Sequence, residues 1–148
     1  MMKPTKHMKG LAMVEFTIIL PILLFLLFSI LELGRAFFLY TELEKLSRDS
    51  TRYLAHVIGG GTGSYALTQD LIDKTSNLAV YGNASGGSDT LLPSLSIDQV
   101  SVTLYGNHVL VEITYPFQPV LSQLPDFFSG DAISLNFNMT SSYTMRVQ

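Results

Sequence analysis

The 148-residue sequence contains no cysteine and no tryptophan, and only 14% of its residues are charged. The absence of cysteine excludes a disulfide framework, a thiolate metal site and a cysteine nucleophile. A net charge of −3 argues against a nucleic-acid-binding protein, which would present a basic surface. Much of the charge deficit lies in residues 11–31, so the remaining chain has a composition compatible with a small soluble domain.

Candidate catalytic and metal-binding groups are scattered along the chain. The three histidines, His7, His56 and His108, show neither metal-ligand spacing nor a neighbouring cluster of carboxylates. Residues 59–63 are rich in glycine but lack the Lys-Ser/Thr pair of a phosphate-binding loop, and no G-x-S-x-G motif occurs. The sequence therefore predicts a protein that is not an enzyme and needs no metal or other cofactor.

A basic stretch precedes a long apolar run at the N-terminus. The first ten residues contain Lys3, Lys6 and Lys9 and no acidic residue. Residues 16–31, FTIILPILLFLLFSIL, are uncharged, and thirteen of them are Ile, Leu or Phe. At roughly −0.3 to −0.6 kcal/mol each, these side chains favour insertion into a bilayer by about 4–8 kcal/mol. The lysines predict a cytoplasmic N-terminus and an exported C-terminal part.

The apolar run has three interpretations. One is a plain membrane anchor, although residues 16–31 reach only ~24 Å, and extension back to Leu11 takes Glu15 into the membrane. Another is a cleaved secretory signal peptide, since residues 34–36 loosely fit a small-x-small cleavage site, although charged residues crowd it. In the third, the chain is cut between Gly10 and Leu11, and the apolar helix is retained.

Glu15 favours the third interpretation. An ionisable group at a membrane span is costly unless it is paired. Cutting after Gly10 would create an ammonium group on Leu11, one helical turn from Glu15, in the same or a neighbouring subunit. Otherwise Glu15 is an interfacial carboxylate that extends to the lipid headgroups. The stretch KGLAMVEF at residues 9–16 resembles the class III signal of type IV pilins and pseudopilins, which a prepilin peptidase cuts before the apolar helix.

A single helix is predicted from about residue 11 to residue 58. Pro21 is expected to kink or locally unwind it. In the second half, the residues Leu39, Leu43, Leu46, Ser50, Tyr53 and Val57 share one helical face. Opposite charges four residues apart predict ion pairs between Glu44 and Arg48 and between Lys45 and Asp49. The second half is therefore predicted to be amphipathic and to pack on a soluble head.

Residues 8–56 also contain a recurring set of motif positions. These are Val14, Glu15, Phe16, Pro21, Glu32, Leu33, Gly34, Arg35, Tyr40, Arg48, Asp49, Arg52, Tyr53 and Ala55. Together they resemble the TadE-like family, minor pilin-like proteins of the Flp (tight adherence, Tad) pilus system. Leu33 and Ser50 stand where relatives often have an aromatic residue and a glycine. The chain is far longer than the major Flp pilin, so the resemblance implies an accessory subunit of TadE or TadF type.

The resemblance implies a non-enzymatic subunit that supports biogenesis of an adhesive pilus at the bacterial inner membrane. Its implied partners are the prepilin peptidase, other Tad/Flp pilus subunits, the inner-membrane assembly platform and membrane lipid, with no nucleic acid. Residues 1–10 would be the leader, residues 11–58 the long helix with a span over 11–31, and residues 59–148 the exported head. The alternative function is an uncleaved, single-span periplasmic scaffold or binding module.

The head is predicted to be α+β and pilin-like. Residues 59–64 are expected to form a hinge, and residues 66–80 a short helix with Leu67, Leu71 and Leu78 on one face. Alternating apolar residues predict a hairpin that turns at Gly106-Asn107. A longer alternation over residues 133–147 predicts an antiparallel strand packed against the long helix.

Residues 116–131 contain three prolines and are predicted to be irregular. The apolar residues in this segment include Phe117, Leu121, Phe127 and Phe128. They either cover an open edge or end of the sheet, or form a contact patch for another pilus subunit. Both alternatives stay open at this stage.

Overall fold

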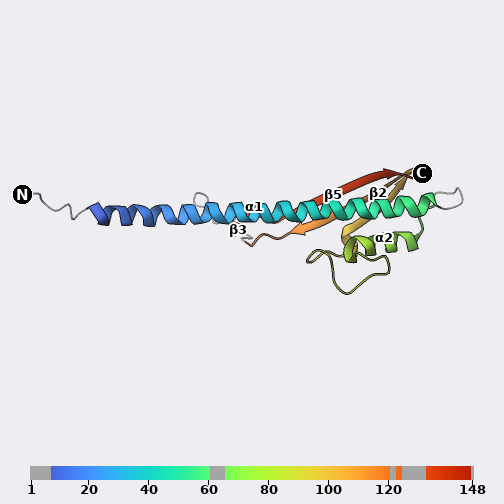
Figure 1. The fold of residues 1–148 in the computed structure, drawn as a ribbon, viewed down its shortest axis with the longest axis horizontal. Coiled ribbons are helices and arrows are strands. Elements are labelled where there is room, and N and C mark those ends of the chain that lie inside the picture. The colour runs from blue at the N-terminus through green and yellow to red at the C-terminus, as the bar shows by residue number, and fades with distance from the viewer. Residues whose placement is uncertain (1–7, 61–65, 121–122, 125–132, 148) are drawn as a thin grey trace, which may run out of the picture. The chain divides into compact units, whose positions relative to one another are not determined.

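The computed structural model describes residues 8–60, 66–120, 123–124 and 133–147, in two units, Met1–Ala36 and Phe37–Gln148. The elements in chain order are α1 (Met8–Gly59), α2 (Gln69–Tyr81), the 3-10 helix η1 (Ile97–Gln99), β1 (Val100–Tyr105), β2 (His108–Phe117), β3 (Gln123–Leu124), β4 (Ile133–Ser134) and β5 (Phe137–Arg146) (Figure 1). The predicted α+β class is confirmed, with a long N-terminal helix and a small antiparallel sheet.

The predicted long helix is observed as α1, which is continuous through Pro21. Local unwinding at this proline is therefore absent. Two hydroxyl groups in the apolar part are satisfied by the helix itself. Thr17 Oγ1 donates to Met13 O and Ser29 Oγ donates to Phe25 O, both at 2.8 Å. Because these bonds stay within the helix, the hydroxyls need no partner from outside it.

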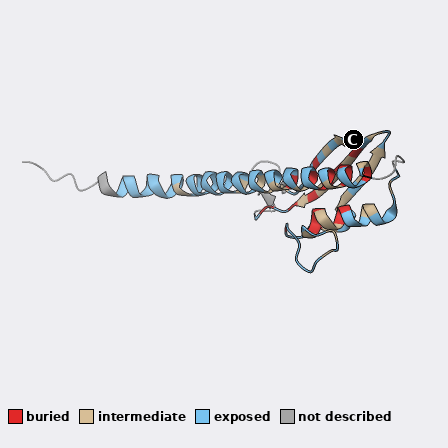
Figure 2. Ribbon diagram, turned by 45° about the vertical axis from the view of Figure 1, so that its right-hand side comes forward, coloured by how far each residue is buried: buried red, intermediate tan, exposed pale blue. Residues whose placement is uncertain are grey.

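The second half of α1 packs on the sheet through a face of small residues. Its buried residues are Leu43, Ser47, Ser50, Thr51, Leu54, Ala55 and Ile58 (Figure 2). Leu46 and Tyr53, which were predicted on this face, are only half-buried, and Val57 is exposed. The prediction followed the large apolar side chains, whereas the structure buries hydroxyl-bearing residues that allow a close approach to the sheet. The predicted face was thus confirmed at Leu43 and Ser50, whereas the rest of the buried face is shifted by about one position.

The main sheet has the antiparallel order β1-β2-β5. The predicted hairpin is confirmed, since Tyr105 pairs with His108 across a turn in which Gly106 has a φ of 59°. A positive φ at the first central position is the requirement of a type II′ turn, which glycine meets without strain. The core lies on the face of β2 that carries Val109, Val111, Ile113, Tyr115 and Phe117, all of them buried.

The C-terminal strand is shorter than predicted. The alternation over residues 133–147 is divided between β4 and β5, and residues 135–136 lie between them. β4 pairs with β3 in a separate two-stranded sheet, so it is withdrawn from the ladder, which begins at the Phe117–Phe137 pair. The alternating pattern could not reveal this change, because a strand of either sheet has a period of two.

The segment after β2 was predicted to be irregular from residue 116 onwards, and this boundary was wrong. β2 continues through Pro116 to Phe117, and Pro116 pairs with Asn138. The pairing of β1 with β2 stops at Ile113, so the other side of β2 is open at Pro116. A proline on such an open side removes no hydrogen bond from the ladder. Residues 121–122 and 125–132 of the predicted excursion lie outside the described residues.

The predicted short helix is observed as α2, which begins three residues later than predicted. Thr68 is its N-cap, and its Oγ1 accepts from the Leu71 N–H at 3.4 Å. Gly82 ends it with a φ of 72°. The buried residues of α2 are Thr75, Ser76, Ala79 and Val80, whereas Leu71 and Leu78 are half-buried. As in α1, the buried face is built from smaller residues than predicted.

The predicted hinge begins at Gly59, which is the last residue of α1. Residues 61–64 of this hinge lie outside the described residues.

Candidate functional site

The first half of α1 is an exposed apolar helix. Phe16, Ile22 and Leu31 have exposed fractions of 58%, 66% and 62%, and most other large apolar side chains of this stretch are also exposed, although Leu20 is half-buried. Of the helices that the structure describes, α1 is the one long and apolar enough to cross a membrane. An exposed apolar surface of this extent marks contact with lipid or with other apolar helices.

The predicted processing site lies in the first turns of α1. Gly10, Leu11 and Glu15 are all exposed, and a Cβ atom added at Gly10 would meet no atom within 4 Å. Leu11 and Glu15 are four residues apart and therefore lie one turn apart on the helix. No ion pair of Glu15 occurs within the part of the chain that is described. The carboxylate is thus available on the helix surface, and its proposed pairing with an ammonium group stays a prediction.

Two further motif residues, Glu32 and Arg35, are brought together. Arg35 Nε and Nη2 both donate to Glu32 Oε1, at 3.1 and 2.5 Å. Charge-assisted bonds of this kind reduce the cost of placing both groups next to an apolar helix. Gly34, between them, has open space around it, and Tyr40 is 39% exposed. Opposite charges three residues apart on a helix could have predicted this ion pair, although the sequence analysis used Glu32 and Arg35 only as positions of the family motif.

The charged residues in the second half of α1 pair differently from the prediction. The observed ion pairs are Lys45 with Glu42 and Arg52 with Asp49, each at 3.7 Å. The predicted pairs of Glu44 with Arg48 and of Lys45 with Asp49 are therefore not the ones formed. Arg48 instead places its guanidinium 5.5 Å from the ring centroid of Tyr143 on β5, a cation–π arrangement.

Hydroxyl groups join α1 to β5 in the head. The Oγ atoms of Ser47 and Ser141 lie 2.9 Å apart. Thr51 Oγ1 lies 2.6 Å from Ser47 O and 3.2 Å from Tyr143 O, and it donates toward both. Ser50 Oγ is buried and has no hydrogen-bond partner within the described parts of the chain. Sequence reasoning placed Ser50 on the packed face but missed Ser47 and Thr51, although the three residues recur at the spacing of a buried helical face.

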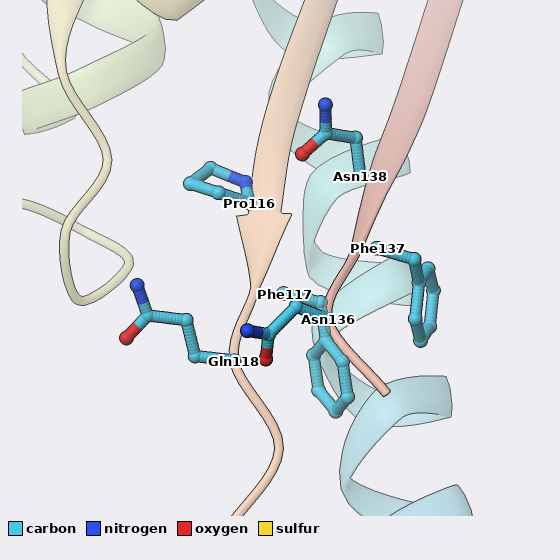
Figure 3. Close-up of a pocket in the computed structure, with 6 residues that line it drawn as sticks. All are labelled: Pro116, Phe117, Gln118, Asn136, Phe137 and Asn138. Carbon is cyan, nitrogen blue, oxygen red and sulfur yellow. The ribbon is translucent and has the colours of Figure 1, made fainter. Parts of the chain in front are cut away.

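The predicted partner patch is described only at Phe117. This residue is 3% exposed, and its ring centroid lies 5.0 Å from that of Phe137, which is 52% exposed. The two rings adjoin an open cavity of about 250 Å³, lined by Pro116, Phe117, Gln118, Asn136, Phe137 and Asn138 (Figure 3). Leu121, Phe127 and Phe128 lie outside the described residues, so the patch stays a prediction.

The described residues contain no group of three or more His, Asp or Glu side chains placed to hold a metal ion. His56 and His108 are both exposed. The features with functional potential are therefore the apolar first half of α1 with its charged residues, and the exposed surfaces of the head.

One family of known proteins matches the sequence of α1. Residues 10–52 match the family of TadE-like proteins. No curated protein and no solved structure matches the chain. The matched range contains Glu15, Pro21, the Glu32–Arg35 pair, Arg48 and Arg52. The predicted resemblance is confirmed over this range: residues 10–52 are similar to the TadE-like proteins.

Proposed function

We propose that this chain is a minor pilin or pseudopilin that supports biogenesis of an adhesive Flp/Tad pilus. The observation that carries the proposal is the exposed apolar half of α1, in which Glu15 stands five residues after Gly10 and precedes an uncharged run. The TadE-like match over the same residues supports it. On this proposal, α1 anchors the chain in the bacterial inner membrane, with the head on the periplasmic side, as the lysines before the span favour.

The proposed processing step is hydrolysis of the Gly10–Leu11 peptide bond by a prepilin peptidase. The C–N bond breaks, the oxygen of a water molecule converts the Gly10 carbonyl into a carboxylate, and the two protons of that water convert the Leu11 nitrogen into an ammonium group. The bond lies close to Met8, where α1 begins, and the ends of a helix open at little cost in free energy. Leu11 is 73% exposed, so a peptidase that acts at the membrane surface meets no packed structure around the bond.

The new ammonium group would change the role of Glu15. In the mature chain, the Glu15 carboxylate and the Leu11 ammonium stand one turn apart, within the reach of a salt bridge between adjacent helices or within one helix. Pairing between subunits would fix the register of one apolar helix against the next. The remainder of the exposed apolar surface would then pack against lipid and against the helices of other subunits.

Mass spectrometry of the mature N-terminus tests the processing step. We expect the chain isolated from the membranes of its own cells to begin at Leu11. We expect Gly10→Val to block cutting and the control Gly34→Val to leave cutting unchanged. An added Cβ atom would meet no atom within 4 Å at either glycine, so a steric clash would not explain a difference between the two variants. A chain that still carries Met1 or Met2, or that begins at Phe37, would contradict the proposal. An uncut chain that functions normally with Glu15→Ala would instead support the scaffold alternative.

A further inference from the structure

The outer edge of β5 exposes backbone groups that have no partner among the described residues. The order β1-β2-β5 leaves one side of β5 without a neighbouring strand. In an antiparallel ladder, the backbone groups of successive residues point to opposite sides of the strand. The Val147 N–H donates to Asn107 O at 2.8 Å, so the odd-numbered residues turn toward β2. The outward groups are therefore those of Asn138, Thr140, Ser142, Thr144 and Arg146.

This edge lacks the features that usually protect an edge strand. Natural proteins use charged side chains, prolines, bulges or a covering helix to prevent additional pairing. β5 contains no proline, its one charged residue is Arg146, and it pairs with β2 residue by residue without a bulge. All five outward residues are exposed. The opposite edge strand, β1, is contacted by α2. Among the described residues, no strand pairs with the outer side of β5.

Arg48 places an uncompensated positive charge beside this edge. Its guanidinium lies over the Tyr143 ring and is exposed. Lys45 and Arg52, its neighbours on α1, each form an ion pair with an acidic residue three positions away. Arg48 has no carboxylate within ion-pair distance in the described ranges. A strand added to β5 would place a side chain directly beside Tyr143 and within reach of this guanidinium.

We propose that the outer edge of β5, together with Arg48, is a docking site for an extended acidic segment of a partner protein, which adds to the sheet as a fourth strand. In this mode of recognition, the backbone hydrogen bonds supply affinity and alternate side chains supply specificity. A carboxylate on the side of α1 would pair with Arg48. Hydroxyl side chains on the other side would lie beside Thr140 and Ser142. The inference does not depend on processing at Gly10.

A second copy of this chain fits the edge less well. Two β5 strands that pair along their full length are related by a two-fold axis near Ser142. Tyr143 is adjacent to that position, so two Arg48 guanidinium groups would approach each other at the axis. Juxtaposed like charges disfavour such a pair, whereas an acidic segment gains from the same charge. The charge beside the edge therefore selects an acidic partner over self-association.

The direct test uses the full chain in detergent micelles with three fluorescein-labelled peptides. TVTETVT presents hydroxyl groups on one side and a central Glu between apolar residues on the other. TVTKTVT reverses the charge, and TVPEPVT lacks two backbone donors. In anisotropy titrations, we expect TVTETVT to bind at least fivefold more tightly than TVTKTVT, and TVPEPVT not to bind. Equal binding of all three peptides, or no binding of TVTETVT, would overturn the proposal.

Variants of the chain locate the site. Ser142→Pro removes one outward N–H and leaves the ladder with β2 intact, whereas the control Ser142→Ala keeps that donor. We expect the first to abolish binding of TVTETVT and the second to retain it. Arg48→Gln, on the exposed side of α1, should bind TVTETVT and TVTKTVT equally, and it tests the proposal even if Ser142→Pro fails to fold. Unchanged peptide binding by Ser142→Pro, unchanged charge preference in Arg48→Gln, or disulfide-linked dimers of Ser142→Cys, at the axis of a paired dimer, would each contradict it.

Discussion

The hydroxyl groups of Ser47 on α1 and Ser141 on β5 lie 2.9 Å apart in the interior of the head. Both residues are nearly inaccessible, at 1% and 4% exposure. A hydrogen bond between two buried side chains contributes about 1 kcal/mol, but the loss of one partner leaves the other unsatisfied and costs about 1–3 kcal/mol. The contact is therefore a sensitive measure of how α1 is held on the sheet.

Replacement of Ser47 should cost more than replacement of Ser141. Ser47→Ala is expected to lower the free energy of unfolding by about 1–2 kcal/mol, because it leaves the buried Ser141 hydroxyl without its partner. Ser141→Ala should cost less, because Ser47 Oγ keeps its hydrogen bond to Glu44 O at 3.0 Å. The double variant should lose less than the sum of the two, since no hydroxyl is then left unsatisfied. Denaturant unfolding of the solubilised chain, followed by circular dichroism, measures the three values. Strict additivity would show that the two hydroxyls do not interact.

Substitutions at the neighbouring residues Ser50 and Thr51 should have opposite effects on stability. Ser50 Oγ is buried without a partner, so Ser50→Ala should leave stability unchanged or raise it by up to about 1 kcal/mol. Thr51 Oγ1 donates within α1 and toward β5, so Thr51→Val, which keeps the shape, should lower stability by about 1 kcal/mol. Melting temperatures of the two variants provide the comparison. A larger loss for Ser50→Ala than for Thr51→Val would refute this account of the interface.

Gly82 is required by the end of α2. Its φ of 72° is left-handed, and its N–H donates to Leu78 O at 2.9 Å. Gly82→Ala should destabilise the head by about 1 kcal/mol, because a Cβ atom disfavours this conformation. Asparagine tolerates the left-handed region better, so Gly82→Asn should cost less. An added Cβ atom would lie 3.3 Å from a Leu91 methyl group, which can move because Leu91 is half exposed. Thermal melts that rank the two variants in the opposite order would disprove the conformational explanation.

Glu15 provides a prediction for assembly. Glu15→Ala is expected to leave membrane insertion and cutting after Gly10 unchanged, while reducing recovery of the chain with other pilus subunits by at least tenfold. Glu42→Ala is the control, because it removes another carboxylate from the same helix. Glu42 forms only a surface ion pair with Lys45, and such pairs contribute little to stability. Co-purification after mild detergent extraction measures both variants. Normal association of Glu15→Ala would show that its carboxylate does not pair between subunits.

The sequence was most informative where local patterns decide the structure. The uncharged run after Glu15 and the absence of proline from residues 22–58 predicted α1, and the Gly106-Asn107 pair between alternating segments predicted the hairpin. Hydrophobic periodicity was less informative about the interface, because Ser47, Ser50 and Thr51 count as polar in such a pattern. Their burial depends on partners on β5, far away in the sequence, and no local pattern contains that information.

The limits of strand prediction had the same origin. Alternation placed Phe137 on a buried face, and this was partly correct, since its ring contacts Phe117. Its exposure of 52% follows from its position in the last pair of the ladder, where less structure covers it. Similarly, Pro116 was taken to end β2, because the sequence could not show that β1 would already have ended on that side of the strand.

The contact between α1 and β5 also has a consequence for the order of folding. Ser47 and Ser141 are 94 residues apart in the sequence. At a synthesis rate of about 5–20 residues per second, α1 emerges roughly 5–20 s before the strand against which it packs. Contacts of such high sequence separation form slowly, since a long loop must close first. During that interval, the hydroxyl-rich face of α1 has no partner within its own chain, and a chaperone or another helix can occupy it.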